Sequence, residues 1–119
     1  MKQTERAWAA GFFDGEGCIS RRLGGTPTSP HLYPFLSIGQ TDKRVLERFK
    51  NAAPGIRQGI GGPYFRKTVF KQKPMYTLQV NGLGPVQTVI GAMWPYLGEV
   101  KKEQFKRVMM EVSNYTAVL

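Results

Sequence analysis

The sequence predicts an α+β fold with the element order α-β-β-α-β-β-α-α. Stretches with apolar residues at helical spacing stand at the start, in the middle and at the end of the chain. Between them lie two pairs of stretches in which apolar and polar residues alternate, as is typical of strands. The 14 glycines and 8 prolines among 119 residues indicate many turns. With 41% hydrophobic residues at this length, we expect one domain over residues 1–119 with its own core.

The first predicted helix begins at Thr4, a favourable N-cap residue, and ends at Gly17. Ala7, Gly11 and Gly15 recur every four residues, so they form a smooth stripe along one face of this helix. Such a stripe lets another backbone approach closely. The residues alone leave open whether that backbone belongs to the same chain or to a second copy.

Two acids, Asp14 and Glu16, stand at the C-terminal end of this helix, where the helix dipole disfavours negative charge. Acids in this position need a compensating cation, and a metal ion is the obvious candidate. A generic Asp-Gly-Glu-Gly segment is more commonly a simple turn at a helix end. Both interpretations therefore remain open on the residues alone.

The first predicted strand covers residues 18–23, and residues 24–30 form a loop rich in Gly, Thr, Ser and Pro. Ile19 and Leu23 share the apolar face of this strand. Arg21 falls on the same side, and because a charged residue does not fit an apolar face, we expect Arg21 to lie at a sheet edge.

Residues 31–40 form the second strand, which has an apolar face and a mixed face. The apolar face carries Leu32, Pro34, Leu36 and Ile38. The other face suits nucleic acid, because it carries His31, Tyr33, Phe35 and Ser37. Two such strands make a ribbon that can enter a DNA major groove. The preceding loop could equally cover the two aromatic side chains.

The second half of the chain continues the alternation. A helix capped by Thr41-Asp42 is followed by a glycine-rich third strand over residues 56–67, bent at Gly61-Gly62, and by a basic turn. A fourth strand covers residues 75–80. Two more helices then begin at Pro85 and near Lys101, separated by Gly98.

The charge and cysteine content restrict the function. The formal net charge of +9 is typical of a small nucleic-acid-binding domain. The lone Cys18 excludes an internal disulfide and a cysteine-based zinc site. The sequence shows no apolar run of about 18 residues and no signal peptide. We expect a soluble intracellular protein, not secreted, in the cytoplasm or nucleoid of a bacterial or phage-infected cell, or in an organelle matrix.

Residues 9–17, Ala-Ala-Gly-Phe-Phe-Asp-Gly-Glu-Gly, resemble the LAGLIDADG signature of homing endonucleases. The element order resembles that family over essentially the whole chain. The chain departs from the signature at Ala9, where Leu is usual, and has Glu16 where many members carry Asp. The resemblance implies a four-stranded antiparallel DNA-binding sheet. Because one motif is present, it also implies a homodimer formed through the first helix, with Ala7, Gly11 and Gly15 at the interface.

The resemblance assigns roles to individual residues. Glu16 corresponds to the catalytic carboxylate that binds Mg²⁺ or another divalent ion such as Mn²⁺, and Gly15 to the residue whose carbonyl assists at the metal. Gln40 corresponds to a residue that orders water, and Arg44 to one near the scissile phosphate. Lys101, or Lys102 with a shift of one residue, corresponds to an active-site lysine. Asp14 corresponds to a structural acid.

The implied function is site-specific, metal-dependent hydrolysis of double-stranded DNA at a long pseudo-palindromic site, by a protein encoded in a mobile intron, intein or phage element. The expected DNA-contacting residues are Arg22, His31, Tyr33, Ser37, Arg57, Arg66, Lys67, Thr77 and Gln79. One alternative is a catalytically silent binder on the same scaffold, either a regulator or an intron-splicing maturase that binds RNA. Another is half of a split enzyme with two motifs.

Overall fold

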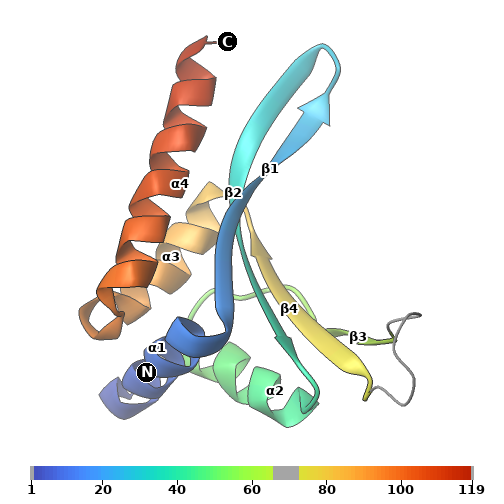
Figure 1. The fold of residues 1–119 in the computed structure, drawn as a ribbon, viewed down its shortest axis with the longest axis vertical. Coiled ribbons are helices and arrows are strands. Elements are labelled where there is room, and N and C mark those ends of the chain that lie inside the picture. Colours follow the sequence, from blue (N-terminus) through green and yellow to red (C-terminus); the bar gives the residue numbers. More distant parts are fainter. Residues whose placement is uncertain (1, 66–72, 119) are drawn as a thin grey trace.

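The computed structural model describes residues 2–65 and 73–118, with the backbone alone for residues 116–118. The described elements confirm the predicted order and add one short 3₁₀ helix (Figure 1). They are α1 (Gln3–Glu16), β1 (Gly17–Thr26), β2 (Ser29–Gln40), α2 (Lys43–Ala52), β3 (Gly61–Tyr64), β4 (Met75–Asn81), α3 (Leu83–Met93), η1 (Trp94–Tyr96) and α4 (Glu99–Val118). No helix in these two ranges is both long and apolar enough to cross a membrane.

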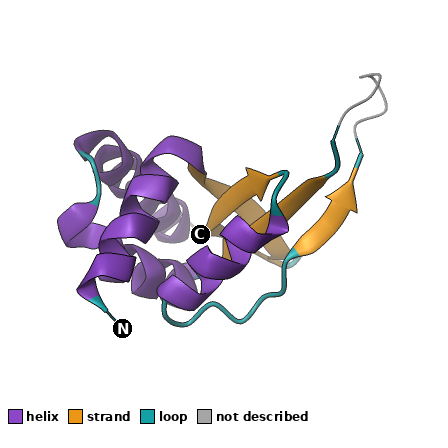
Figure 2. Ribbon diagram, turned by 90° about the horizontal axis from the view of Figure 1, so that it is seen from below, coloured by secondary structure: helices purple, strands orange, loops and turns teal. Residues whose placement is uncertain are grey.

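The four strands form one antiparallel sheet in the order β1-β2-β4-β3. The helices gather on one side and the strands on the other (Figure 2). The apolar faces of β2 and β4 close the core from the sheet side, with Leu36, Ile38, Leu78 and Val80 almost fully buried. From the helix side the core is closed by Phe13, Phe49, Val89, Ile90 and Met93. The predicted alternation of β2 and β4 is therefore confirmed.

The start of α1 differs from the prediction, and its end agrees. Lys2, in an extended conformation, is the N-cap residue, and its carbonyl accepts hydrogen bonds from the amides of Glu5 and Arg6. The prediction that Thr4 caps the helix is wrong, because Thr4 already lies inside the first turn. Gly17 ends the helix, and a Cβ at this position would collide with the ring of Phe13.

The predicted loop over residues 24–30 is also wrong. β1 and β2 continue as a paired ribbon as far as Thr26 and Ser29, so the turn between them is only two residues long. The amide of Ser29 donates to the Thr26 hydroxyl oxygen across this turn. Leu23 is 60% exposed although it lies on the apolar side of this ribbon. Arg21 lies on the edge strand as expected, and it forms a salt bridge with Glu111 of α4.

The second half contains four smaller differences. The described part of the third strand is only four residues long, and its irregular pairing between Gly61 and Tyr64 confirms the predicted bend. Helix α3 begins at Leu83 instead of Pro85, because Gly82 with φ +97° acts as its N-cap and accepts the first helical hydrogen bond from Val86. It ends at Met93 and continues as η1, whereas α4 begins two residues earlier than predicted.

Candidate metal and DNA-binding site

Helix α1 has one face inside the protein and one outside. Ala9, Ala10 and Phe13 are completely buried. Gly11 and Gly15 are exposed, and a Cβ built on either would meet no described atom within 4 Å. We call Ala7, Gly11 and Gly15 the small-residue stripe. Gly11 and Gly15 therefore do not pack against the described part of the same chain, whereas Ala7 is half-buried.

Asp14, at the end of α1, is bound to the start of α4. Both carboxylate oxygens accept from the backbone amide of Gly98, at 3.1 and 3.0 Å. The carbonyl of Gly98 accepts from the amide of Lys102, so Gly98 is the N-cap of α4. The partial positive charge of that helix N-terminus compensates the carboxylate. The interpretation that a metal compensates both acids is therefore wrong for Asp14, and its structural role is supported by this contact.

Glu16 differs from Asp14 in having no such contact. It is the last residue of α1, is exposed, and makes no hydrogen bond or salt bridge with the described residues. Gly15 beside it is exposed too. The described residues include no group of three or more His, Cys, Asp or Glu side chains that could hold a metal ion. One carboxylate and one backbone carbonyl suit Mg²⁺, which takes one or two carboxylates and fills its other positions with water and phosphate oxygens.

Gln40 and Arg44 lie at the same end of the sheet as Glu16. The register pairs Gly17 at the start of β1 with Ile38, two residues before Gln40. Arg44, in the first turn of α2, is 87% exposed on its side chain and donates to Asp42 through Nε and Nη2, each at 3.0 Å. These hydrogen bonds lower the pKa of Asp42 and raise the pKa of Arg44, so the guanidinium stays charged. In this structure the guanidinium of Arg44 is thus paired with the carboxylate of Asp42.

Helix α2 is fixed on α1 by a second guanidinium. Arg48 donates to both carboxylate oxygens of Glu5, at 2.9 and 3.2 Å, and lies 3.8 Å from the ring centre of Trp8. Its hydrogen bonds lower the pKa of Glu5. Because α2 carries Arg44, this contact helps to hold the start of α2 near α1.

Lys101 and Lys102 project to different sides of α4. The Lys101 ammonium lies 5.9 Å from the ring centre of Phe13, and so close to the last turn of α1. The Lys102 ammonium lies 5.3 Å from the ring centre of Trp94 and 3.7 Å from Glu99. Of the two lysines, Lys101 is the one beside the helix that ends in Glu16.

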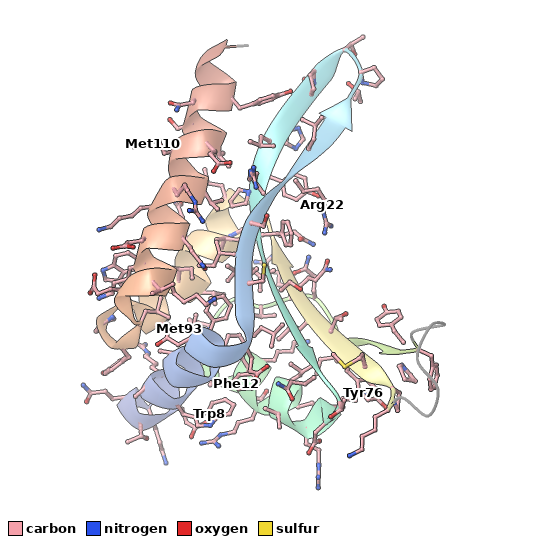
Figure 3. All side chains as sticks on the ribbon, in the orientation of Figure 1. Trp8, Phe12, Arg22, Tyr76, Met93 and Met110 are labelled. Atoms are coloured by element: carbon pink, nitrogen blue, oxygen red, sulfur yellow. The ribbon has the colours of Figure 1, made fainter. Side chains whose placement is uncertain are left out.

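The sheet surface opposite the helices is polar and aromatic. The register aligns nine residues there, which we call the outer face: Cys18, Ser20, Arg22, Tyr33, Phe35, Ser37, Thr77, Gln79 and Asn81. The Arg22 guanidinium lies 4.5 Å from the ring centre of Phe35. Figure 3 shows Arg22 on the side of the ribbon that faces away from α4, the helix that carries Met110. His31 continues this surface toward the turn, with its ring centre 5.9 Å from that of Tyr33.

The structure places one predicted DNA contact away from this surface and does not describe two others. Arg66 and Lys67 lie outside the described residues. Arg57 is exposed but lines a hollow with Gly55 and Pro85, at the start of α3. Because Arg57 lies in an irregular segment, no periodicity was available to predict which surface its side chain would join.

Gln58 and Asn81 are two polar residues that the sequence patterns did not single out. They line a hollow of about 360 Å³ together with Thr77 and Gln79. Asn81 could have been found, since it continues the alternation of Thr77 and Gln79 along β4. Gln58 carried no such signal, because no regular element surrounds it.

No family model and no curated protein matches this sequence. Solved structures do match its fold, over 93–98% of the chain in three examples. The LAGLIDADG homing endonuclease I-GzeII, in complex with its DNA target, has a TM-score of 0.69 at 20% identity. The homing endonuclease I-CvuI, in complex with the I-CreI target, has a TM-score of 0.68 at 24% identity. The intron-encoded homing endonuclease I-CeuI, complexed with DNA, has a TM-score of 0.66 at 14% identity.

The chain spans 36% of the length of I-GzeII, 67% of I-CvuI and 57% of I-CeuI. It has the LAGLIDADG homing endonuclease fold.

Proposed function

We propose that this chain is one subunit of a site-specific, metal-dependent DNA endonuclease of the LAGLIDADG family, which acts as a homodimer on a long pseudo-palindromic site. The fold agrees with that of endonucleases whose structures contain DNA targets. One such structure was determined with Mg and another of the same enzyme with Ca.

The observation that carries the proposal is the position of Glu16. The structure leaves this carboxylate without a partner among the described residues, at the point where the small-residue stripe, the start of β1 and the ribbon meet. A structural acid at a helix end is expected to have a partner, as Asp14 has in Gly98. An exposed carboxylate beside a polar sheet surface is instead available to a cation that also contacts phosphate.

In the proposed site, Glu16 and the carbonyl of Gly15 would hold a divalent ion, Mg²⁺ or Mn²⁺, which would supply an activated water and stabilise charge on phosphate oxygens. Gln40 would orient the attacking water, and Arg44 and Lys101 would stabilise the negative charge that develops on the phosphate. For Arg44 this requires an exchange of partner, from Asp42 to a phosphate. Its exposed side chain leaves room for that exchange.

The homodimer supplies the second half of this site. A two-fold axis would bring the small-residue stripe against its own copy, so that two Glu16 carboxylates meet at the seam. Each carboxylate would then serve one DNA strand, and each ribbon would contact one half-site in the major groove. The proposed DNA contacts on the outer face and the ribbon are Arg22, His31, Tyr33, Ser37, Thr77 and Gln79.

The test is cleavage of the DNA that flanks the gene's own insertion point, in the presence of Mg²⁺, by the natural chain and by the Glu16→Gln variant. Because the carboxylate is needed to hold the ion, we expect Glu16→Gln to lower the cleavage rate by about 1,000-fold or more while DNA binding changes little. Glu103→Gln is the matched control, since Glu103 is an exposed acid on α4. We expect it to cut normally.

Equal cutting by Glu16→Gln and the natural chain would overturn the assignment of the metal site. If the natural chain bound this DNA without cutting it, the silent binder would be the better description. Binding of the intron RNA by the same chain would then identify the maturase.

A further inference from the structure

We infer that the amide side chains of Gln58, Gln79 and Asn81 form an adenine-reading site on the β4 end of the outer face. This inference rests on the proposed DNA-binding function and adds to it the class of base that this part of the sheet recognises. It concerns specificity only and assigns no step of the cleavage reaction to these residues.

The three amides share the hollow of about 360 Å³ described above, together with Tyr64 and Thr77. Gln79 and Asn81 are two residues apart on β4, so both side chains point to the same side of the sheet. They lie opposite Ser37 and Phe35 of β2, which belong to the outer face. Gln58 comes from the segment before β3 and closes the hollow from a different part of the chain.

Gly61 keeps this hollow open. A Cβ at this position would lie 2.6 Å from the Tyr64 hydroxyl and 3.3 Å from the Thr77 hydroxyl oxygen. Any larger residue would therefore displace Tyr64 from the wall of the hollow. The shape of this surface therefore depends on the absence of a side chain at Gly61.

The lining is polar without charge. Among the described residues around the hollow there is no Lys, Arg, Asp or Glu, and the polar side chains are amides and hydroxyls. Asn and Gln amides pair with adenine through its N6 donor and N7 acceptor, whereas guanine is usually read by Arg or Lys. Uncharged amides also contribute little to phosphate attraction. Their chemistry is therefore suited to reading A·T pairs.

Asn81 provides a second indication. Its side-chain oxygen is buried and has no hydrogen-bond partner among the described residues. An unsatisfied buried acceptor destabilises the folded chain. Since Asn81 as a whole is half-buried and its amide torsion is soft, rotation could present this oxygen to the N6 amino group of an adenine.

The test is selection of bound DNA from a library with randomised half-sites, followed by affinity measurements on single-base variants of the selected site. We expect the natural chain to select adenine at neighbouring positions of each half-site. In Gln79→Ala and Asn81→Ala, discrimination at one such position should fall by between about 5-fold and 150-fold, the range for one bidentate base contact. Gln79→Arg should shift the preference at its position from adenine to guanine.

Gln87→Ala is the matched control, because Gln87 is an exposed amide on α3, away from the outer face. It should leave every preference unchanged. Specific binding by the natural chain, with the same adenine preferences in Gln79→Ala and Asn81→Ala, would overturn the adenine-reading site and leave the proposed function intact. Failure of the natural chain to bind any double-stranded DNA would overturn both.

Discussion

The two faces of helix α1 contain similar residues in opposite surroundings. The inner face places Ala9 and Ala10 at 0% exposure, so the helix backbone approaches the core closely. The outer face presents Gly11 and Gly15 to open space within this chain. A helix that is apolar or small on both faces is typical of one that is buried on both sides. The comparison indicates that the fold uses one face of α1 and leaves Gly11 and Gly15 on the other face exposed, as the proposed dimer requires.

The largest effect should come from the inner face. Phe13 is fully buried, and its ring centre lies 6.2 Å from that of Phe49. Phe13→Ala should lower the free energy of unfolding by about 3–5 kcal/mol, because it removes apolar contacts and leaves a cavity. Gly11→Ala should instead raise it by about 0.5–1 kcal/mol, since alanine is the better helix former. Urea denaturation of both variants, at a concentration where the chain is monomeric, measures the contrast.

Similar losses of stability in the two variants would contradict the assignment of inner and outer faces. Circular dichroism of each variant in the absence of urea serves as the control for retained fold.

The next effect concerns association. Gly11→Leu should weaken the proposed dimer by about 2–3 kcal/mol, because each copy would insert a leucine where two backbones approach. Sedimentation should show a folded monomer at concentrations where the natural chain is dimeric, and DNA cleavage should be lost with it. Gly91→Leu is the matched control, since Gly91 is also an exposed helical glycine at which an added Cβ would meet no described atom within 4 Å.

We expect Gly91→Leu to leave association unchanged. A dimer that tolerates Gly11→Leu but not Gly91→Leu would place the interface on α3. A natural chain that stays monomeric with and without DNA would refute the shared-helix dimer altogether.

Much of the fold could be predicted, because the repeat of apolar residues follows directly from the geometry of helices and strands. The burial of Leu36 and Ile38 on one face of β2 is an example. The continuation of the ribbon beyond Leu23 was missed because Gly24 and Gly25 are weak strand formers. Their pairing with His31 and Pro30 depends on the partner strand, which local propensity does not describe.

Only those parts of the candidate site that depend on neighbouring residues in the sequence could be predicted. The motif located Glu16, and the small-residue spacing located the stripe. What compensates Asp14 could not be predicted, since its partner Gly98 lies 84 residues away. The hollow at Asn81 depends on Gln58 and Tyr64, which come from the irregular chain around β3.

A small predicted effect on stability distinguishes Asp14 from Glu16, the two acids at the end of α1. Asp14→Asn keeps an oxygen that can accept from the Gly98 amide but removes the charge that favours the N-terminus of α4. We expect a loss of about 1 kcal/mol in unfolding free energy, with cleavage retained at a somewhat lower rate. Urea denaturation and cleavage kinetics of Asp14→Asn and Glu16→Gln, measured together, should show opposite profiles. Glu16→Gln should lose cleavage without losing stability, because its carboxylate has no partner to lose within the described chain. A cleavage loss in Asp14→Asn as deep as that in Glu16→Gln, at unchanged stability, would mean that both acids act on the DNA and that the contact with Gly98 is exchanged during the reaction.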